Sequence, residues 1–116
     1  MRIARLYAGS DGKSHFEDID IPLVDDEAGE RRSEFIEATG IILRETSGEF
    51  NIDFHNAPRR QFVITLAGEG EIIVGDGTSR RFGPGDIMLA EDITGQGHIT
   101  RAVGKRPRIS IFVTLD

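Results

Sequence analysis

Residues 61–86 read QFVITLAGEGEIIVGDGTSRRFGPGD, and this stretch decides the fold class. Three short strand-like runs occur in it, at 61–67, 71–74 and 79–82, and apolar and polar side chains alternate in the first. A glycine turn follows each run. The turn at 75–77, Gly-Asp-Gly, indicates a tight hairpin because such turns need residues with positive φ. The stretch therefore predicts consecutive strands joined by sharp turns.

The same pattern extends toward both ends of the chain. Further strand-like runs lie at 3–8, 41–44, 49–56, 87–90, 98–103 and 109–115. Residues 34–39 have the composition of a short helix, but Gly40 interrupts it and β-branched residues follow, so we interpret 34–44 as strand. Residues 25–32 are expected to form a charged surface loop. About nine short strands with no long amphipathic helix predict an all-β sandwich or barrel.

The length of the chain fits one domain. Its 116 residues have room for a single core that buries about 65% of the surface exposed by the unfolded chain. There is no fixed repeat, linker or low-complexity tract. We therefore expect one domain over 1–116, with N-terminal strands and a loop at 1–40 and the barrel at 41–115.

Composition narrows the classes of function. A net charge of −6 disfavours binding to a phosphate backbone, so nucleic acid is not an expected partner. No apolar run approaches the ~20 residues of a membrane span, so no membrane is expected either. The first residues lack the features of a signal peptide, and we expect a cytoplasmic protein. Because there are no cysteines, any metal must be held by nitrogen and oxygen.

The candidate functional residues lie on three separate strand-like runs that a small barrel would bring together. His55, Gln61 and His98 are the central trio. Asp53 lies two residues before His55, so strand periodicity places both side chains on one face. The expected pocket is completed by threonines on the same runs and by two arginines that would steer an anionic substrate: Thr65, Thr100, Arg59 and Arg60.

The first part of this pattern resembles a motif of the cupin superfamily of small β-barrels. In that family the first motif runs His-x-His, three or four residues, Glu, six residues, Gly. Here His55 matches the first histidine and Gly68 the closing glycine. Ala57 falls in the place of the second histidine, and Gln61 takes the place of the glutamate.

The second part resembles the other cupin motif, which runs Gly, five residues, Pro-x-Gly, two residues, His. Gly85 opens it here, and Gly95 and His98 keep the Gly-x-x-His ending. The proline is missing and the intervening loop is two residues longer. The resemblance covers about residues 41–115 and is more specific for the fold than for the ligands.

The resemblance implies a double-stranded β-helix, or jelly-roll, barrel with a divalent metal: iron, manganese, zinc or nickel. The ligands it implies are His55, Gln61 and His98. Glutamine is a neutral and weaker donor than glutamate, so this set leaves the charge of the ion uncompensated. Asp53 would supply a carboxylate as ligand or catalytic base, and Glu91 and Asp92 are other sources. The activity implied is that of a dioxygenase, isomerase or lyase.

Two other functions use the same residues without a metal. In one, the chain is a non-catalytic module that binds or senses a small molecule. In the other, it is a structural dimerisation domain, and the histidines are simply hydrogen-bonded within the barrel. Phe62, Ile64 and Leu66 point away from the pocket and need a cover, either the N-terminal strands of the same chain or a second copy of the chain. We predict a homodimer. Cupins commonly pair through their N-terminal strands.

Overall fold

The computed structural model describes all 116 residues and consists of strands, turns and loops. The strands are β1 (Arg2–Ala8), β2 (Ser14–Asp20), β3 (Val24–Asp25), β4 (Arg31–Arg32), β5 (Gly40–Thr46), β6 (Asn51–His55), β7 (Gln61–Ala67), β8 (Glu69–Ile73), β9 (Ser79–Phe82), β10 (Ile87–Glu91), β11 (His98–Val103) and β12 (Arg108–Thr114). No helix has the length and apolar character needed to cross a membrane. The predicted all-β class is confirmed.

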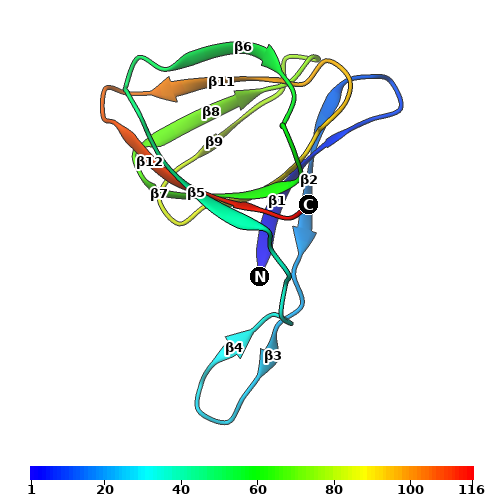
Figure 1. Ribbon diagram of the computed structural model, residues 1–116, viewed down its shortest axis with the longest axis vertical. Helices are drawn as coiled ribbons and strands as arrows, with labels where there is room; N and C mark the ends of the chain where they lie inside the picture. Colours follow the sequence, from blue (N-terminus) through cyan, green and yellow to red (C-terminus); the bar gives the residue numbers. More distant parts are fainter.

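The strands form two main sheets that lie over one another (Figure 1). Six strands make the larger sheet in the order β2-β1-β10-β7-β12-β5, and four make the smaller one in the order β6-β11-β8-β9. Strands β3 and β4 pair only with each other and form an arm that projects from the body. The sheets stay separate, and none closes into a barrel.

Buried and outward-facing side chains alternate along β7, and this alternation shows which face of the larger sheet is turned toward the smaller sheet. Gln61, Val63 and Thr65 are almost completely buried, at 3%, 6% and 1% exposure, on the face toward the smaller sheet. Phe62 and Ile64 therefore point to the outer face. The strand is central in the sheet and pairs antiparallel with both β10 and β12.

The hydrophobic core lies between the two sheets. Leu6 from β1 and Met88 from β10 meet Ile72 from β8 and Phe82 from β9 there, and Leu6 is fully buried. Burying a side chain of this size stabilises the fold by about 1.5–3 kcal/mol. The core fills only part of the space between the sheets, and a cavity occupies another part.

The structure corrects the sequence-based interpretation of residues 25–44. The predicted strand begins only at Gly40, and residues 33–38 pair with no other strand. Phe35 in this segment is 90% exposed. Residues 25–32, predicted as a loop, instead contain parts of the β3–β4 pair.

Candidate functional site

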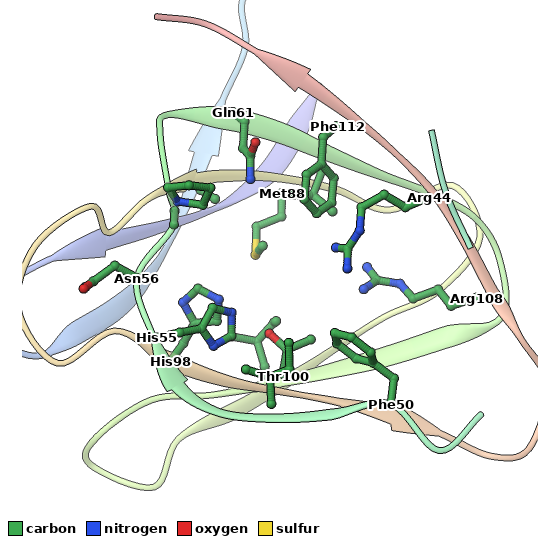
Figure 2. Close-up of a pocket in the computed structure, with 16 residues that line it drawn as sticks. Arg44, Phe50, His55, Asn56, Gln61, Met88, His98, Thr100, Arg108 and Phe112 are labelled. Carbon is green, nitrogen blue, oxygen red and sulfur yellow. The ribbon is translucent and has the colours of Figure 1, made fainter. Parts of the chain in front are cut away.

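A cavity of about 250 Å³ lies between the two sheets and is lined by side chains from both. Its walls are largely apolar, and they include Phe50, Ile52, Val63, Met88 and Phe112. Polar side chains gather on two sides of it: histidines on one and arginines on the other (Figure 2). An apolar pocket with a few convergent polar groups is the usual form of a small-molecule site.

The two histidines lie side by side at one end of the cavity. His55 ends β6, His98 begins β11, and the two are direct partners across the antiparallel pair. Their ring centroids are 4.5 Å apart and the rings are tilted by 54°. Gln61 and Thr100 also line this cavity. The structure thus brings together the trio nominated by the sequence, although Gln61 comes from the opposite sheet.

Hydrogen bonds orient both imidazoles. The Nδ1 of His98 donates to Oδ2 of Asp92 at 2.5 Å, and the Nδ1 of His55 donates to the backbone carbonyl of Asp53 at 2.8 Å. Asp92 is fully buried, and its Oδ2 also accepts a hydrogen bond from Ser14 at 2.7 Å. With Nδ1 used as the donor, Nε2 of each ring is the acceptor in the neutral imidazole.

The structure contradicts the placement of Asp53 in the pocket. In the pairing of β6 with β11, His98 stands opposite His55 but Thr100 stands opposite Ile52, so β6 carries one extra residue between the two pairs. This irregularity reverses the alternation of side chains. As a result Ile52 and His55 both line the cavity, whereas Asp53 is exposed on the outside.

The other expected carboxylates do not enter the cavity either. Asp92 accepts a hydrogen bond from Nδ1 of His98. Glu91 lies on the face of β10 that is turned away from the cavity, where it pairs with two arginines. Nowhere do three or more His, Cys, Asp or Glu side chains form a group that could hold a metal ion. Two imidazoles and an amide would give a divalent cation only neutral donors, which is a weaker set than one that includes a carboxylate.

Two arginines on the other side of the cavity were missed by sequence reasoning. Arg108, the first residue of β12, is only 9% exposed, and its Nη2 donates to Oγ1 of Thr65 at 2.8 Å. Its Nε has no partner. Arg44 on β5 lies over the ring of Phe112, with its guanidinium carbon 4.6 Å from the ring centroid. The two-residue alternation along β12 could have predicted this position of Arg108. It places Arg108 on the same face of the strand as Phe112, which lines the cavity.

Neither guanidinium is neutralised. None of the ion pairs in the structure includes Arg44 or Arg108. Burial lowers the pKa of the Arg108 guanidinium, and the positive charge of Arg44 lowers it further. Arginine nevertheless stays protonated in proteins. The cavity therefore contains a buried positive charge with no carboxylate beside it.

The remaining predicted residues lie elsewhere. Arg59 and Arg60 do not line the cavity, which corrects their expected role in steering a substrate. Arg60 instead donates to Glu91 at 2.6 Å and pairs with Asp116 at 3.4 Å. Thr65 is buried outside the cavity lining and contacts it only through its hydrogen bond to Arg108.

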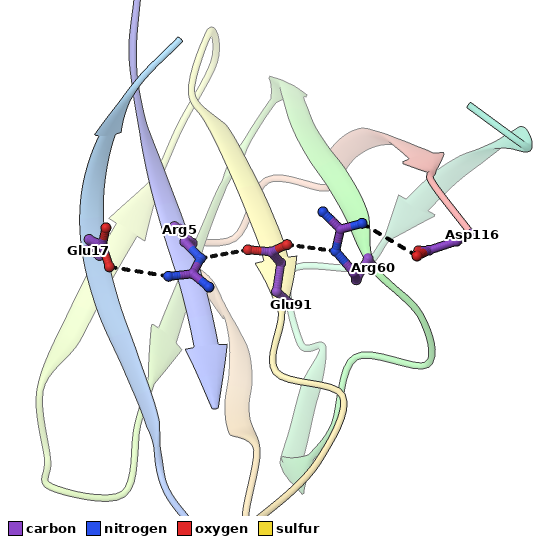
Figure 3. A network of polar contacts seen from close by, with 5 residues as sticks. All are labelled: Arg5, Glu17, Arg60, Glu91 and Asp116. Atoms are coloured by element: carbon purple, nitrogen blue, oxygen red, sulfur yellow. Dashed lines mark hydrogen bonds and ion pairs between the residues drawn. The ribbon is translucent and has the colours of Figure 1, made fainter. Parts of the chain in front are cut away.

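Glu91 is the centre of a charged network on the outer face of the larger sheet (Figure 3). Arg5 from β1 and Arg60 from the residues before β7 each donate to it at 2.6 Å, and Arg5 also pairs with Glu17 at 3.2 Å. Burial raises the pKa of Glu91, but the hydrogen bonds and charges of the two arginines together outweigh it and lower the pKa. The ionised form of Glu91 therefore stabilises the folded state.

We expect Glu91→Gln to destabilise the protein at neutral pH by about 1–2 kcal/mol, since the amide keeps the volume but loses the charge. The lowered pKa means that this stabilisation is present above the unfolded-state pKa of about 4.3 and is lost as the pH falls through the folded-state value. Thermal unfolding at about pH 7 and about pH 3 measures both effects. Glu17→Gln, at the exposed end of the network, is the control and should change stability by less than about 0.5 kcal/mol. An equal loss of stability in Glu91→Gln at both pH values would contradict the predicted dependence of this stabilisation on the ionisation of Glu91.

No known protein-family model matches the chain, and the comparison with curated proteins finds no significant match. Solved structures with a similar fold include the following two proteins. A conserved protein of unknown function from Streptococcus pyogenes, SPY1581, is 21% identical, with a TM-score of 0.50 over 69% of this chain and 68% of its own. The protein NMB1881 from Neisseria meningitidis is 14% identical, with a TM-score of 0.52 over 72% of this chain and 81% of its own. At these identities the likeness shows the fold alone.

Proposed function

We propose that this chain binds a small organic anion in the cavity between its sheets, and that Arg44 and Arg108 hold the anionic group. The observation that carries the proposal is the burial of Arg108 without a carboxylate partner. An uncompensated buried charge costs several kcal/mol. An anionic ligand would remove that cost, because a guanidinium fork matches the oxygens of a carboxylate or phosphate.

The size and lining of the cavity support a small ligand. A volume of about 250 Å³ suits a molecule of on the order of ten non-hydrogen atoms, if each takes somewhat less than the ~30 Å³ of a liquid water molecule. Phe50 and Phe112 flank Arg44 and limit its exposure to water. Electrostatic attraction is stronger in such a partly desolvated site than at the surface.

The cupin-like jelly roll belongs to the same proposal. Two facing sheets, the pairing of His55 with His98, and the presence of Ala57 in the cavity wall where a cupin has its second histidine all support it. The homodimer is also part of the proposal. Its support is the apolar outer face of the larger sheet, which leaves these side chains exposed: Ile41, Leu43, Leu66 and Ile109.

The metal-dependent enzyme favoured by the sequence remains the second candidate. The observation in its favour is the pair of free Nε2 atoms on His55 and His98, each held in place through its Nδ1 as in metal-binding histidines. The missing carboxylate and the positive charges of Arg44 and Arg108 make the metal-free binder the better-supported function.

Thermal unfolding in the presence of butanoate, succinate and glycerol 3-phosphate tests the proposal. At a concentration 100 times its dissociation constant, a ligand should stabilise the protein by about 2.7 kcal/mol, which is a rise of roughly 10 °C in Tm. The rise should persist after dialysis against a chelator. It should be largely lost in Arg44→Met and unchanged in Arg59→Gln, whose arginine lies outside the cavity.

Two outcomes would contradict the proposal. One is that none of the three anions raises Tm in the wild-type protein. The other is that Arg44→Met responds as the wild type does, because the anion would then bind elsewhere. A rise that disappears on chelation and returns with iron, manganese, zinc or nickel would favour the metal-dependent alternative.

A further inference from the structure

We infer that the ligand is a small hydroxy acid, whose hydroxyl group donates to the imidazole of His55 or His98 and accepts from the amide of Gln61, on the side of the cavity away from the arginines. This inference rests on the proposed function, which assigns the anionic end of the ligand to Arg44 and Arg108. It adds the chemical identity of the other end. It follows from the hydrogen-bonding capacity that the protein leaves unused there.

The histidines offer acceptors. A backbone carbonyl can only accept a hydrogen bond, so the contact with Asp53 places the proton of His55 on Nδ1. The carboxylate of Asp92 places the proton of His98 on Nδ1 in the same way. In the neutral form of each ring Nε2 is then a lone-pair acceptor, and no protein group donates to either Nε2.

Gln61 offers a donor. Its side chain is only 3% exposed, its Oε1 is buried without a hydrogen-bond partner, and its amide nitrogen donates to no protein group. Figure 2 shows its amide nitrogen directed toward the centre of the cavity, on the side opposite the histidine rings. A buried amide without a partner is uncommon because its desolvation is not compensated. This makes Gln61 an independent indication that a ligand completes the site.

A hydroxyl group satisfies both kinds of partner. It donates to an imidazole Nε2 and accepts from the amide N–H of Gln61. A second carboxylate would face the lone pairs of His55 and His98, and an ammonium group would face the N–H of Gln61 in a cavity that already holds two guanidinium charges. An apolar end would leave the Nε2 atoms of His55 and His98 and the amide nitrogen of Gln61 without partners.

Isothermal titration calorimetry with matched ligands tests the inference. The probes are butanoate and its 2-, 3- and 4-hydroxy derivatives, titrated with EDTA present so that a metal plays no part. We expect at least one hydroxy isomer to bind about tenfold or more tightly than butanoate, since a site built for a hydroxyl discriminates against ligands that lack it. The three isomers differ in the distance between the hydroxyl and the carboxylate, so together they test which separation fits the site.

Variants then assign the hydroxyl to its partners. In His55→Phe and in Gln61→Met the ratio of hydroxy acid to butanoate affinity should fall toward one. His55 is half-buried, so the first variant keeps the test valid if replacement of the buried Gln61 impairs folding. His15→Phe is the matched control: this histidine pairs with Asp11 away from the cavity, and the ratio should stay at the wild-type value.

The outcomes separate this inference from the proposed function. If butanoate binds and no hydroxy isomer binds more tightly, the hydroxyl subsite is wrong and the anion site stands. The same holds if the preference survives in both His55→Phe and Gln61→Met. If neither butanoate nor any isomer binds, the anion site itself is wrong and the inference falls with it.

Discussion

Arg108→Met is expected to abolish the stabilisation by small anions while leaving the ligand-free protein at least as stable as the wild type. The substitution keeps most of the side-chain volume and removes a buried charge that no carboxylate compensates. Replacing buried charges with apolar groups of similar volume is often neutral or stabilising, by about 1–4 kcal/mol. Loss of a charge-assisted, bidentate contact should weaken anion binding by roughly 100-fold or more.

Thermal unfolding with and without butanoate measures both effects, and Arg108→Lys is the informative control. Lysine keeps the charge but loses the planar fork, so we expect weaker anion binding without a gain in stability. The contact with Thr65 provides the alternative explanation, in which Arg108 is purely structural. A loss of more than about 2 kcal/mol in ligand-free Arg108→Met, with anion binding retained, would establish that alternative instead.

Gly97→Ala is expected to be the most disruptive single-methyl substitution near the site. Gly97 has φ of 78°, which disfavours any side chain, and an added Cβ would overlap the backbone carbonyl of His55. Backbone atoms cannot move aside as a flexible side chain can. We expect a loss of more than about 3 kcal/mol, from strain and displacement of the chain together.

Gly77→Ala separates these two causes. Gly77 has φ of 88°, but an added Cβ there meets no atom within 4 Å. It should therefore lose only about 1 kcal/mol. Urea unfolding of the two variants measures the difference, and equal losses would contradict the role of the His55 contact. If Gly97→Ala still folds, the displaced His55 should also weaken the preference for a hydroxy acid.

The sequence-based predictions that the structure confirms were those based on the pattern of neighbouring residues. The bounds of β7, β9 and β11 agree with the predicted runs, because two-residue alternation and glycine turns are properties of neighbouring residues. Residues 34–38 were wrongly predicted as strand, since a segment becomes a strand only when another strand pairs with it. His55, Gln61 and His98 were nominated by the pattern of residues and do line the cavity.

Pairing between distant strands decided what those residues can do. One extra residue in β6, detectable only against its partner β11, puts His55 in the cavity and Asp53 outside it. Glu91 and Asp92 are adjacent in sequence, yet one binds arginines on the outer face and the other is buried behind His98. Consecutive residues of a strand point to opposite faces, so the environment of each depends on what lies over that face.

By itself, the sequence determined an all-β chain with its turns and the polar residues nominated for a pocket, because these follow from local periodicity and from the conformational freedom of glycine. Only the tertiary structure decided the chemistry of the pocket. It brought Arg44 and Arg108, 64 residues apart, onto paired strands of one sheet and left them without carboxylates. The charge and hydrogen-bonding capacity of a cavity depend on which groups remain unpaired after all strands have packed, and that is a property of the whole fold.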